Sequence, residues 1–577
     1  VFISLSDGIA TDASAQLVIN INTDPLYKHQ WHLDNTGQAN FASATGLEGE
    51  DLNIKSSISA GYDGSGIIVS VMDEGLEILH EDLTDNIIPN KSYNFVYGTY
   101  DPTSTNLDGD HGTSVAGIIA SKGWNNKGGR GVAPNAGLVG YNILEYYTYS
   151  NAAWAWGMDN ALAQDNDIFN MSYGTILYYN NSSTFSFPNQ LWMNSISLSG
   201  LTNGINNLRD GKGGIYVKSM GNDFRRNATN GYACGEAGVD DDGAMGCSIR
   251  FHDDQHIFPY TIGVGALAAN GIKSSYSTAD PSIWVSSTGG EFGYSSALGW
   301  NVSGSDSEEP AIMTTDQSSC SKGYVSSNGT NKNAFNNSSN PHPENPSCNY
   351  SSTFNGTSSA APSVAGAIAV LLDAYPNLSW RDVKHIIAKT ARKLDVDRAY
   401  SRNDIVQYEW ETNAAGYNHH YWYGFGAFDL DAAITYASSY ISTFEAFTNY
   451  EWDYSLNDDG SDLNLNLPSF SLSESTISYL PSTSNNFIEF LQIAIYLDKD
   501  IPKDIGLSLV SPQGTEINIL QPFTNVSGNP NGNWFVIGVS GFYGENIQGD
   551  WKLKIVDYTN NDDSGTLINW GIKAYGH

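Results

Sequence analysis

The chain has 577 residues, of which 27 are basic and 62 acidic, so its formal net charge is −35. This charge repels nucleic acid and anionic membranes and excludes both as partners, whereas it points to cationic partners or to a saline medium. No apolar run reaches the roughly 20 residues that a membrane-spanning helix needs. The 12% aromatic content excludes a disordered chain, and the length indicates more than one domain.

Apolar runs alternate with segments rich in small residues from about residue 55 onward. The mixed stretch before them, 1–50, is expected to pack on the main domain as an N-terminal extension. The alternation is typical of βαβ units with a parallel sheet, and we assign it to one domain, 51–437. The predicted strands are 67–72, 137–144, 167–173, 215–220 and 260–266, and the predicted helices are 111–121 and 151–164.

Later segments follow different patterns. A polar stretch at roughly 300–350, rich in Asn and Ser, is predicted to be a loop. The helix predicted at 358–375 is apolar all round, so we expect it to be buried. The next helix is predicted to begin at Ser379, with Asp382 at the spacing of a capping box. Short alternating runs over 438–577, separated by Asn, Gly and Pro, predict an antiparallel all-β module, a sandwich or jelly roll.

Four cysteines fall into two local pairs, Cys234 with Cys247 and Cys320 with Cys348. Four cysteines allow three connectivities, of which we expect this local one. Four buried free thiols are the alternative. The chain begins at Val1 rather than Met, so an export signal has been removed or left out, and we expect an exported protein.

Three motifs contain the residue types of nucleophilic acyl transfer, which needs a hydroxyl, an imidazole base and a carboxylate. Asp73 ends the first predicted strand, His111 opens a helix, and Ser358 opens the buried helix. A serine at a helix N-terminus gains the positive end of the helix dipole, and its own N–H can stabilise an oxyanion. Asn222, at another strand end, is the predicted second oxyanion donor. Ser359 is the alternative nucleophile because the two serines are adjacent.

The order of these motifs and the residues around them resemble the subtilisin-like serine proteases, or subtilases, over roughly 55–435. Further motifs, and the β module, are similar to the kexin and furin branch, in which a P domain follows the catalytic domain. The resemblance implies an α/β subtilisin-like catalytic domain and then an all-β P domain. It also implies a serine endopeptidase with Ser358 as nucleophile, since the family places the nucleophile directly after Thr. The segments that carry the resemblance are 73–83, 131–134, 170–174, 377–383, 423–429, 509–515, 549–553 and 565–570.

Kexin-like enzymes cleave after paired basic residues, which acidic side chains can bind through charge-assisted hydrogen bonds. The resemblance therefore implies cleavage after basic or dibasic residues. One alternative is a broad-specificity subtilase without basic preference, in which these acids are simply solvated; another is an inactive subtilase that acts as an adhesin through its β module. The matching residues are Glu74 and Asp108 for the penultimate basic residue, Ser172 and Gly174 as further substrate-binding residues, and Glu236 or one of Asp240, Asp241 and Asp242 for the residue before the scissile bond.

The resemblance also implies a structural Ca²⁺ ion, which subtilases of this type bind through carboxylates and loop carbonyls. Asp24, Asp82 and Asn126 fall at matching positions. The loop 125–131 is one residue shorter than the family pattern, so no carbonyl ligand can be assigned there. A solvated Asp82 without a metal is the alternative.

The expected partners follow from charge and resemblance together. We expect a monomer that acts on protein or peptide substrates with basic residues, with folding assisted by a removed propeptide or a separate chaperone. The P domain is expected to be structural; an adhesion or carbohydrate-binding module is the alternative. N-glycosylation sequons at 170–172 and 355–357 lie inside the active-site motifs, which favours a host without such glycosylation and hence a secreted bacterial protease.

Overall fold

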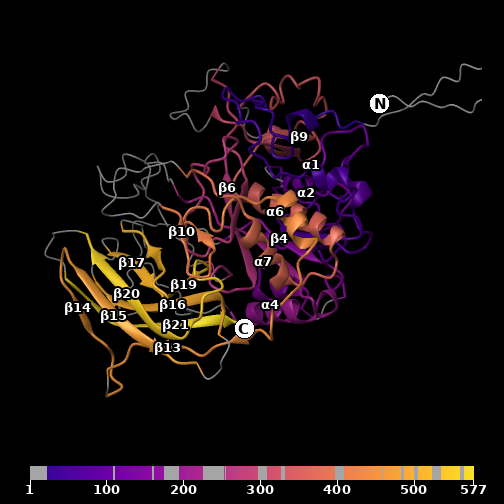
Figure 1. Cartoon of the computed structure of the whole chain (residues 1–577). Coiled ribbons are helices and arrows are strands. Elements are labelled where there is room, and N and C mark those ends of the chain that lie inside the picture. Colours follow the sequence, from indigo (N-terminus) through magenta and orange to yellow (C-terminus); the bar gives the residue numbers. More distant parts are fainter. Residues whose placement is uncertain are drawn as a thin grey trace, which may run out of the picture.

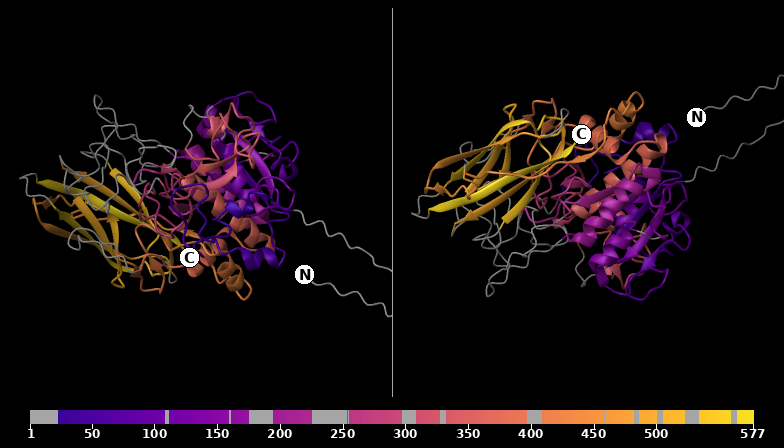
Figure 2. Two further views of the ribbon diagram at one scale, coloured as in Figure 1. Left: turned by 90° about the horizontal axis from the view of Figure 1, so that it is seen from above. Right: turned by 90° about the horizontal axis from the view of Figure 1, so that it is seen from below.

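The computed structural model describes residues 23–107, 111–158, 161–174, 194–224, 253, 255–296, 308–326, 332–396, 409–457, 459–481, 486–499, 505–522, 534–558 and 564–577. An α/β unit and a sandwich of antiparallel strands lie side by side (Figures 1 and 2). The predicted fold class, a parallel sheet with helices followed by an all-β module, is confirmed.

Seven strands form the central sheet in the order β2-β3-β1-β4-β5-β6-β7, and every neighbouring pair is parallel. Nearly every strand position is buried, as expected of a parallel sheet that is covered on both faces. The strands are β1 (Ile68–Asp73), β2 (Tyr93–Asn94), β3 (Gly137–Asn142), β4 (Ile168–Met171), β5 (Ile215–Ser219), β6 (Thr261–Leu267) and β7 (Val285–Thr288).

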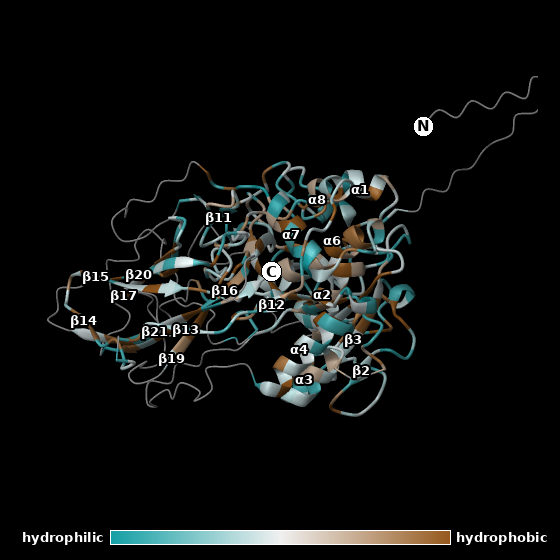
Figure 3. Ribbon diagram, turned by 60° about the horizontal axis from the view of Figure 1, so that its bottom comes forward, coloured by the Kyte–Doolittle hydropathy of each residue, from teal (hydrophilic) through white to brown (hydrophobic). Residues whose placement is uncertain are grey.

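Two long helices pack against each other and against this sheet, α2 (His111–Ala120) and α6 (Thr357–Ala374). Among the described residues, α6 alone is long and apolar enough to cross a membrane, but 83% of it is buried, so it is a core helix. A second pair, α3 (Tyr149–Ala155) and α4 (Ser195–Asn207), lies side by side (Figure 3). The other helices are α1 (Lys55–Ser59), α5 (Gly323–Ser326), α7 (Trp380–Thr390) and α8 (Leu430–Ala437).

Two helix predictions have different outcomes. Ser379 is the N-cap of α7 and forms the predicted capping box with Asp382. The helix predicted at 151–164 is wrong in length, because α3 already ends at Ala155. Gly157 follows with a φ of 93°, a left-handed conformation that a continuing α-helix does not contain.

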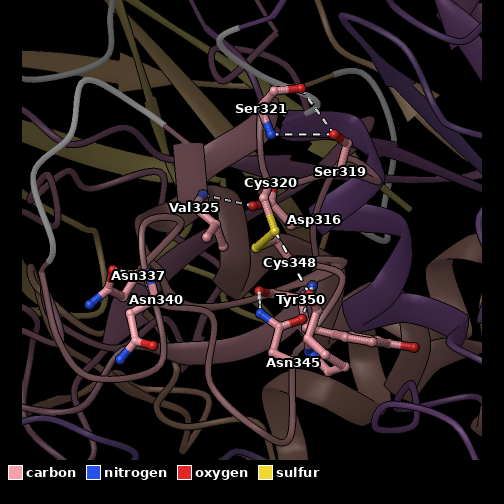
Figure 4. Close-up of a disulfide and its surroundings, with 11 residues drawn as sticks. Asp316, Ser319, Cys320, Ser321, Val325, Asn337, Asn340, Asn345, Cys348 and Tyr350 are labelled. Carbon is pink, nitrogen blue, oxygen red and sulfur yellow. Dashed lines mark hydrogen bonds between the residues drawn. A yellow bond between two sulfur atoms is a disulfide. The ribbon is translucent and has the colours of Figure 1, made fainter.

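The prediction of a loop at 300–350 is wrong in part. It contains β8 (Ile312–Thr315), which pairs in antiparallel fashion with β9 (Tyr350–Phe354), directly before α6. The predicted Cys320–Cys348 disulfide is present and closes the segment between these strands (Figure 4). Cys234 and Cys247 lie outside the described residues.

The C-terminal module consists of two antiparallel sheets around an apolar core. One sheet has the order β12-β21-β16-β19, with β13 and β14 also on β21, and the other has the order β15-β20-β17-β18. A small hairpin, β10 (Glu411–Thr412) with β11 (Asn418–His419), precedes α8. The strands are β12 (Thr448–Asn449), β13 (Asp453–Tyr454), β14 (Leu465–Leu467), β15 (Leu472–Tyr479), β16 (Ile488–Asp498), β17 (Ile505–Val510), β18 (Glu516–Leu520), β19 (Trp534–Val539), β20 (Gly549–Asp557) and β21 (Gly565–Gly576).

The two units share one hydrophobic core. Phe490, Tyr543 and Tyr575 of the sandwich belong to the same buried cluster as the helices and strands of the α/β unit. Polar contacts reinforce this packing: Gln492 Nε2 donates to the carbonyl of Ile257 at 2.6 Å. The sandwich therefore completes the core of the α/β unit.

Candidate active site

The three predicted catalytic side chains lie at the carboxyl end of the central sheet. Asp73 is the last residue of β1, His111 the first residue of α2, and Ser358 the second residue of α6. β1 lies near the middle of the sheet, between β3 and β4. Strand ends and helix starts meet at this edge of a parallel α/β sheet, which is where such folds place their ligands.

Asp73 and His111 form a direct hydrogen-bonded pair. Nδ1 of His111 lies 3.0 Å from Oδ1 and 2.9 Å from Oδ2 of Asp73. This contact requires glycine at position 112, because a Cβ there would lie 1.9 Å from the carbonyl oxygen of Gly75 and 2.8 Å from the Cβ of Asp73. The close approach of α2 to the end of β1 thus explains the His-Gly sequence.

The surroundings of His111 determine its pKa. Burial opposes the charged imidazolium of His111, but the neighbouring Asp73 carboxylate, its hydrogen bond and the charge of Glu74 outweigh burial and raise the pKa of His111. Asp73 is fully buried, so its carboxylate has little other solvation. Asp73 therefore orients the imidazole with Nε2 left for another partner, and stabilises its protonated form.

Ser358 and Ser359 differ sharply in accessibility. Ser358 is partly exposed, and its hydroxyl donates to the carbonyl of Ser172 at 3.3 Å. Ser359 is fully buried, and its hydroxyl contacts the carbonyls of Gly289 at 2.8 Å and Gly356 at 2.7 Å. Only Ser358 can therefore meet a substrate without a rearrangement of the helix.

Asn222 faces the same point as the N–H of Ser358. The backbone N–H and the hydroxyl of Thr357 both donate to Oδ1 of Asn222, at 2.9 Å and 3.0 Å. Since a backbone N–H can only donate, the accepting atom must be the oxygen, which leaves the amide Nδ2 directed elsewhere. A Cβ on Gly356 would lie 3.1 Å from this Nδ2 and 3.4 Å from the N of Ser358. Both donors thus border the space beside Gly356.

Gly356 is held in the conformation that keeps this space open. Its φ is 105°, which favours glycine, and its N–H donates to the hydroxyl of Tyr276 at 2.8 Å. Tyr276 is buried and donates in turn to the carbonyl of Gly289 at 3.1 Å. A residue 80 positions away in the sequence therefore fixes the turn before Ser358.

The predicted substrate-binding residues fall into two groups. Glu74 follows Asp73 and is half-buried; burial and the charge of Asp73 raise the pKa of its carboxyl group. Ser172 is buried, whereas Gly174 is exposed at the rim of the site. The remaining predicted acids lie outside the described residues, namely Asp108, Glu236, Asp240, Asp241 and Asp242.

Most oxygen atoms of the predicted calcium ligands already have partners. Asp24 Oδ2 pairs with Nε of Arg130, whose guanidinium also lies over the rings of Tyr27 (4.1 Å) and Trp124 (4.6 Å). Three further oxygens accept N–H groups: Asp24 Oδ1 from Asn125 N (3.2 Å), Asp82 Oδ1 from Asn125 Nδ2 (2.7 Å) and Asn126 Oδ1 from Thr23 N (2.9 Å).

This donor set does not fit Ca²⁺, which takes 6–8 oxygen ligands. Of the four carboxylate oxygens, Asp82 Oδ2 is the one with neither a hydrogen bond nor an ion pair among the described residues. No group of three or more His, Cys, Asp or Glu able to hold a metal occurs in that part of the chain. The guanidinium of Arg130 supplies positive charge to Asp24 at this position instead.

Several residues that shape the site were not predicted to do so. Thr357 lies inside the serine motif, so its hydroxyl could have been read as a support for Asn222. Tyr276 and Lys218 contact the site only through the tertiary fold, and no local pattern identifies them. The hydroxyl of Ser172, a predicted substrate-binding residue, also donates to the carbonyl of Ser358 at 3.0 Å, a contact that was not predicted.

The family comparisons agree with this geometry. The Subtilase family model matches residues 64–426, more than half of the chain, and the Proprotein convertase P-domain model matches residues 488–574. The chain is 32% identical to the Aeromonas extracellular serine protease of Aeromonas sobria over 96% of this chain and 91% of that one. It is 29% identical to kexin of Saccharomyces cerevisiae over 98% of this chain and 57% of that one.

Solved structures show the same likeness. The crystal structure of the serine protease of Aeromonas sobria superimposes with a TM-score of 0.81 at 29% identity, covering 99% of both chains. The complex of that protease with a chaperone gives a TM-score of 0.79 at 28% identity, covering 99% of this chain and 98% of that one. Together with the family match, these likenesses show that the chain belongs to the subtilase family and is a serine protease with a P domain.

Proposed function

We propose that the protein is an endopeptidase in which Ser358 attacks the scissile carbonyl and His111 takes its proton. In the structure the hydroxyl of Ser358 donates to the carbonyl of Ser172. The hydroxyl must therefore rotate toward Nε2 of His111 when substrate binds. Attack forms a tetrahedral adduct, and His111 then protonates the leaving amine to give an acyl-enzyme. Water repeats the sequence in reverse and releases the acid. Asp73 holds the imidazole tautomer throughout.

The observation that supports this proposal best is the convergence of two oxyanion donors on the nucleophile. Nδ2 of Asn222 and the N–H of Ser358 border the space beside Gly356, next to the hydroxyl that attacks. Preorganised donors of this kind stabilise charge that develops in the transition state, and removal of one costs about 10²–10³ in kcat.

Substitution of the two adjacent serines tests the assignment of the nucleophile. Ser358→Ala should abolish both peptide hydrolysis and labelling by a fluorophosphonate probe, because the attacking oxygen is gone. Ser359→Ala is the matched control and should retain labelling, since its buried hydroxyl bonds only to carbonyls. Labelling that persists in Ser358→Ala would refute the assignment.

We also propose a preference for basic residues on the acyl side of the scissile bond. Glu74, half-buried beside the catalytic pair, supports it, because a partly desolvated carboxylate binds a cation strongly. The charge of −35 supports it through long-range attraction of cationic peptides. The chain is also similar to proteins named kexin and neuroendocrine convertase 2, and this similarity supports the proposed basic preference.

Matched peptides test this preference. A fluorogenic peptide with Lys at the penultimate position should be cleaved faster than one with Ala there, and Glu74→Gln should reduce that advantage by about tenfold. Glu48→Gln, a change at an exposed acid of the N-terminal segment, is the control and should leave the ratio unchanged. Equal rates on both peptides in the wild type would instead support the broad-specificity alternative.

We also propose that the protein is secreted and that its folding is assisted. Relatives at 32% and 29% identity are named as an extracellular and a microbial serine protease, which supports export of this chain. The chaperone complex of the Aeromonas sobria protease supports a separate folding partner as an alternative to a removed propeptide. Calcium at Asp24 and Asp82 is not part of the proposal, because Arg130 already pairs with Asp24.

A further inference from the structure

A cavity lies beside α1, at the opposite end of α2 from His111. Its volume is about 410 Å³, within the range of about 300–1,000 Å³ that is typical of small-molecule sites. Residues of α1 form one wall, and the segment between α2 and β3 forms the other. In that segment the N–H of Gly131 donates to the carbonyl of Ser121, directly after α2. Because α2 has ten residues, the cavity is separated from His111 by about 15 Å of helix.

The walls of the cavity are mostly apolar. Ile54 and Pro134 are buried, whereas Ile58 and the rings of Tyr27 and Trp124 are partly exposed. An apolar surface of this kind binds the hydrocarbon body of a ligand, because both surfaces are then removed from water. The walls therefore predict a ligand with an aromatic or aliphatic body.

Arg130 gives the same cavity unused hydrogen-bond donors. Its Nε pairs with Asp24 at 2.7 Å, and the rings of Tyr27 and Trp124 contact its guanidinium. Its Nη1 and Nη2 atoms are accessible to solvent and donate to none of the described residues. An arginine has five N–H donors in a planar fork that matches the two oxygens of a carboxylate. The four donors on Nη1 and Nη2 therefore remain for a ligand.

The charges that line the cavity favour an anion. Arg130 and Lys55 belong to the lining, and no Asp or Glu does so in the part of the chain that the structure describes. The net charge of −35 opposes anions at long range, but at 0.15 M salt the charges more than about 8 Å away are largely screened. The lining therefore determines how a small ligand with one negative charge is recognised.

We propose that this cavity binds a small carboxylic acid with an apolar body. The carboxylate pairs with Nη1 and Nη2 of Arg130, and the body packs against Ile54 and Ile58. Since Asp24 and two aromatic rings already hold the guanidinium, little side-chain freedom is lost on binding. The site goes beyond the proposed function, because it contains neither the catalytic pair nor the oxyanion donors.

Calorimetric titration of the chain at 0.15 M salt with 3-phenylpropionate and with octanoate tests the proposal. For acids of this size we expect saturable one-to-one binding with a Kd of about 10⁻⁵–10⁻³ M. The tighter of the two identifies the body as aromatic or aliphatic. The matching neutral amide should bind about tenfold more weakly than its acid. Equal affinity of acid and amide would overturn the proposal, as would the lack of saturable binding by both acids.

Prior labelling with a fluorophosphonate separates this cavity from the active site. Labelled and unlabelled protein should bind the acid with the same Kd, because Ser358 is not part of the cavity. Loss of binding on labelling would place the acid at the active site and overturn the proposal. The measurement requires no turnover, so its result is independent of the proposed peptidase mechanism.

Variants then assign the binding to Arg130. Arg130→Lys keeps a cation beside Asp24 but removes the planar fork, so the Kd of the acid should rise by about tenfold. Arg392→Lys is the matched control, at an arginine outside the cavity that pairs with Glu50 at 2.8 Å, and should leave the Kd unchanged. An unchanged Kd in folded Arg130→Lys would refute the assignment.

A second variant decides if Arg130→Lys does not fold. Ser59 is an exposed residue of α1 that lines the cavity, so Ser59→Trp places a bulky ring there without disturbing the core. We expect this variant to raise the Kd of the acid at least about tenfold. An unchanged Kd in Ser59→Trp would refute the proposed site.

Discussion

The amide of Asn222 is oriented by a neighbour that does not itself touch the reacting atoms. Thr357 occupies Oδ1 of Asn222 with two donors, and its hydroxyl also accepts the N–H of Gly221 at 2.9 Å. The proposed oxyanion donor, Nδ2 of Asn222, is therefore fixed before substrate arrives. Such preorganisation avoids reorganisation at the moment of reaction.

The raised pKa of His111 predicts the acid limb of the pH–rate profile. Below its pKa the imidazole is protonated and cannot accept the proton of Ser358, so kcat/KM should rise with pH as His111 loses its proton. Because Asp73 and Glu74 stabilise the imidazolium, the midpoint should lie above the ordinary value of 6.5. Rates measured from about pH 5 to about pH 8 check this.

Asp73→Asn provides the matching test of the same electrostatics. It removes the charge that raises the pKa of His111, so the midpoint should fall and kcat should drop by about 10⁴. A profile whose midpoint stays in place would show that another group controls the acid limb.

Substitution of Asp82 distinguishes a calcium site from a site in which Arg130 pairs with Asp24. Burial raises the pKa of Asp82 to about 7, so the folded chain resists its ionisation while the unfolded chain does not. This group therefore lowers the free energy of unfolding as pH rises from its ordinary value of 3.8 toward 7. Asp82→Asn should raise Tm at pH above 7, or leave it unchanged, with and without EDTA.

Arg130→Met should lower Tm, because it leaves the buried Asp24 unpaired, and breaking such a pair costs about 3–5 kcal/mol. A bound calcium ion would give a different pattern: EDTA would lower the Tm of the wild type, and Asp82→Asn would be strongly destabilising. Calorimetry of the three proteins with and without EDTA separates the two cases.

Residue-scale prediction works where a residue and its partners share a local motif. Asp73, His111 and Ser358 each end or begin an element, so their position at the sheet edge follows from chain order and element type. Tyr276 and Lys218 act through contacts that only the folded chain creates. Their roles could not be predicted, because a buried tyrosine and a lysine in a strand fit many environments.

At the scale of elements, α6 contains a break in its backbone hydrogen-bond pattern at Ser358. Pro362 is the sixth residue of the helix and has no N–H, so the carbonyl of Ser358 lacks its usual helical donor. The hydroxyl of Ser172 takes that role at 3.0 Å, and Asn170 Nδ2 donates to the same hydroxyl at 2.9 Å. The helix that carries Ser358, the proposed nucleophile, is thereby linked to the segment after β4.

Ser172→Ala should disrupt this link. The carbonyl of Ser358 would lose its donor in a buried region, which costs about 1–3 kcal/mol. We expect a lower Tm together with a several-fold lower kcat, since the nucleophile would be less firmly placed relative to the substrate. Ser363→Ala, which removes a hydroxyl from the same helix away from the nucleophile, is the control; a kcat loss of equal size there would contradict the local effect.

Element prediction succeeded where the composition of a segment or its end signal is local. The capping box of α7 and the all-round apolar character of α6 are local features, and both helices form as predicted. The prediction for 300–350 missed β8, because its partner β9 is more than 30 residues away and the Asn- and Ser-rich sequence between them hides the pairing. Hydroxyls of β8 bind the start of α2: Thr315 Oγ1 donates to the carbonyl of Thr113 at 2.7 Å.

At the scale of the whole molecule, a charged pair reinforces the shared core. Arg381 of α7 binds the carboxylate of Glu489 at 2.9 Å through Nε, and both side chains are nearly buried. Glu489 also bonds His577 at 2.9 Å. The hydrogen bonds to Arg381 and His577 outweigh burial and lower the pKa of Glu489, so the pair stays ionised at neutral pH.

Removal of the sandwich tests the proposed structural role of the P domain. A chain that ends after α8 exposes the surface that Phe490, Tyr543 and Tyr575 cover, so we expect an insoluble or inactive product. Glu489→Ala is a milder probe and should lower Tm, because it leaves Arg381 unpaired at the interface. A soluble, active chain without the sandwich would refute the structural role.

The shared core also determines when activity can first arise during synthesis. The residues that close the core beside Tyr260 include Tyr575 of β21, which follows every other described strand in the sequence. A ribosome-bound chain that has made Asp73, His111 and Ser358 therefore still lacks part of the core beneath them. We therefore expect proteolytic activity to arise only after translation has passed β21.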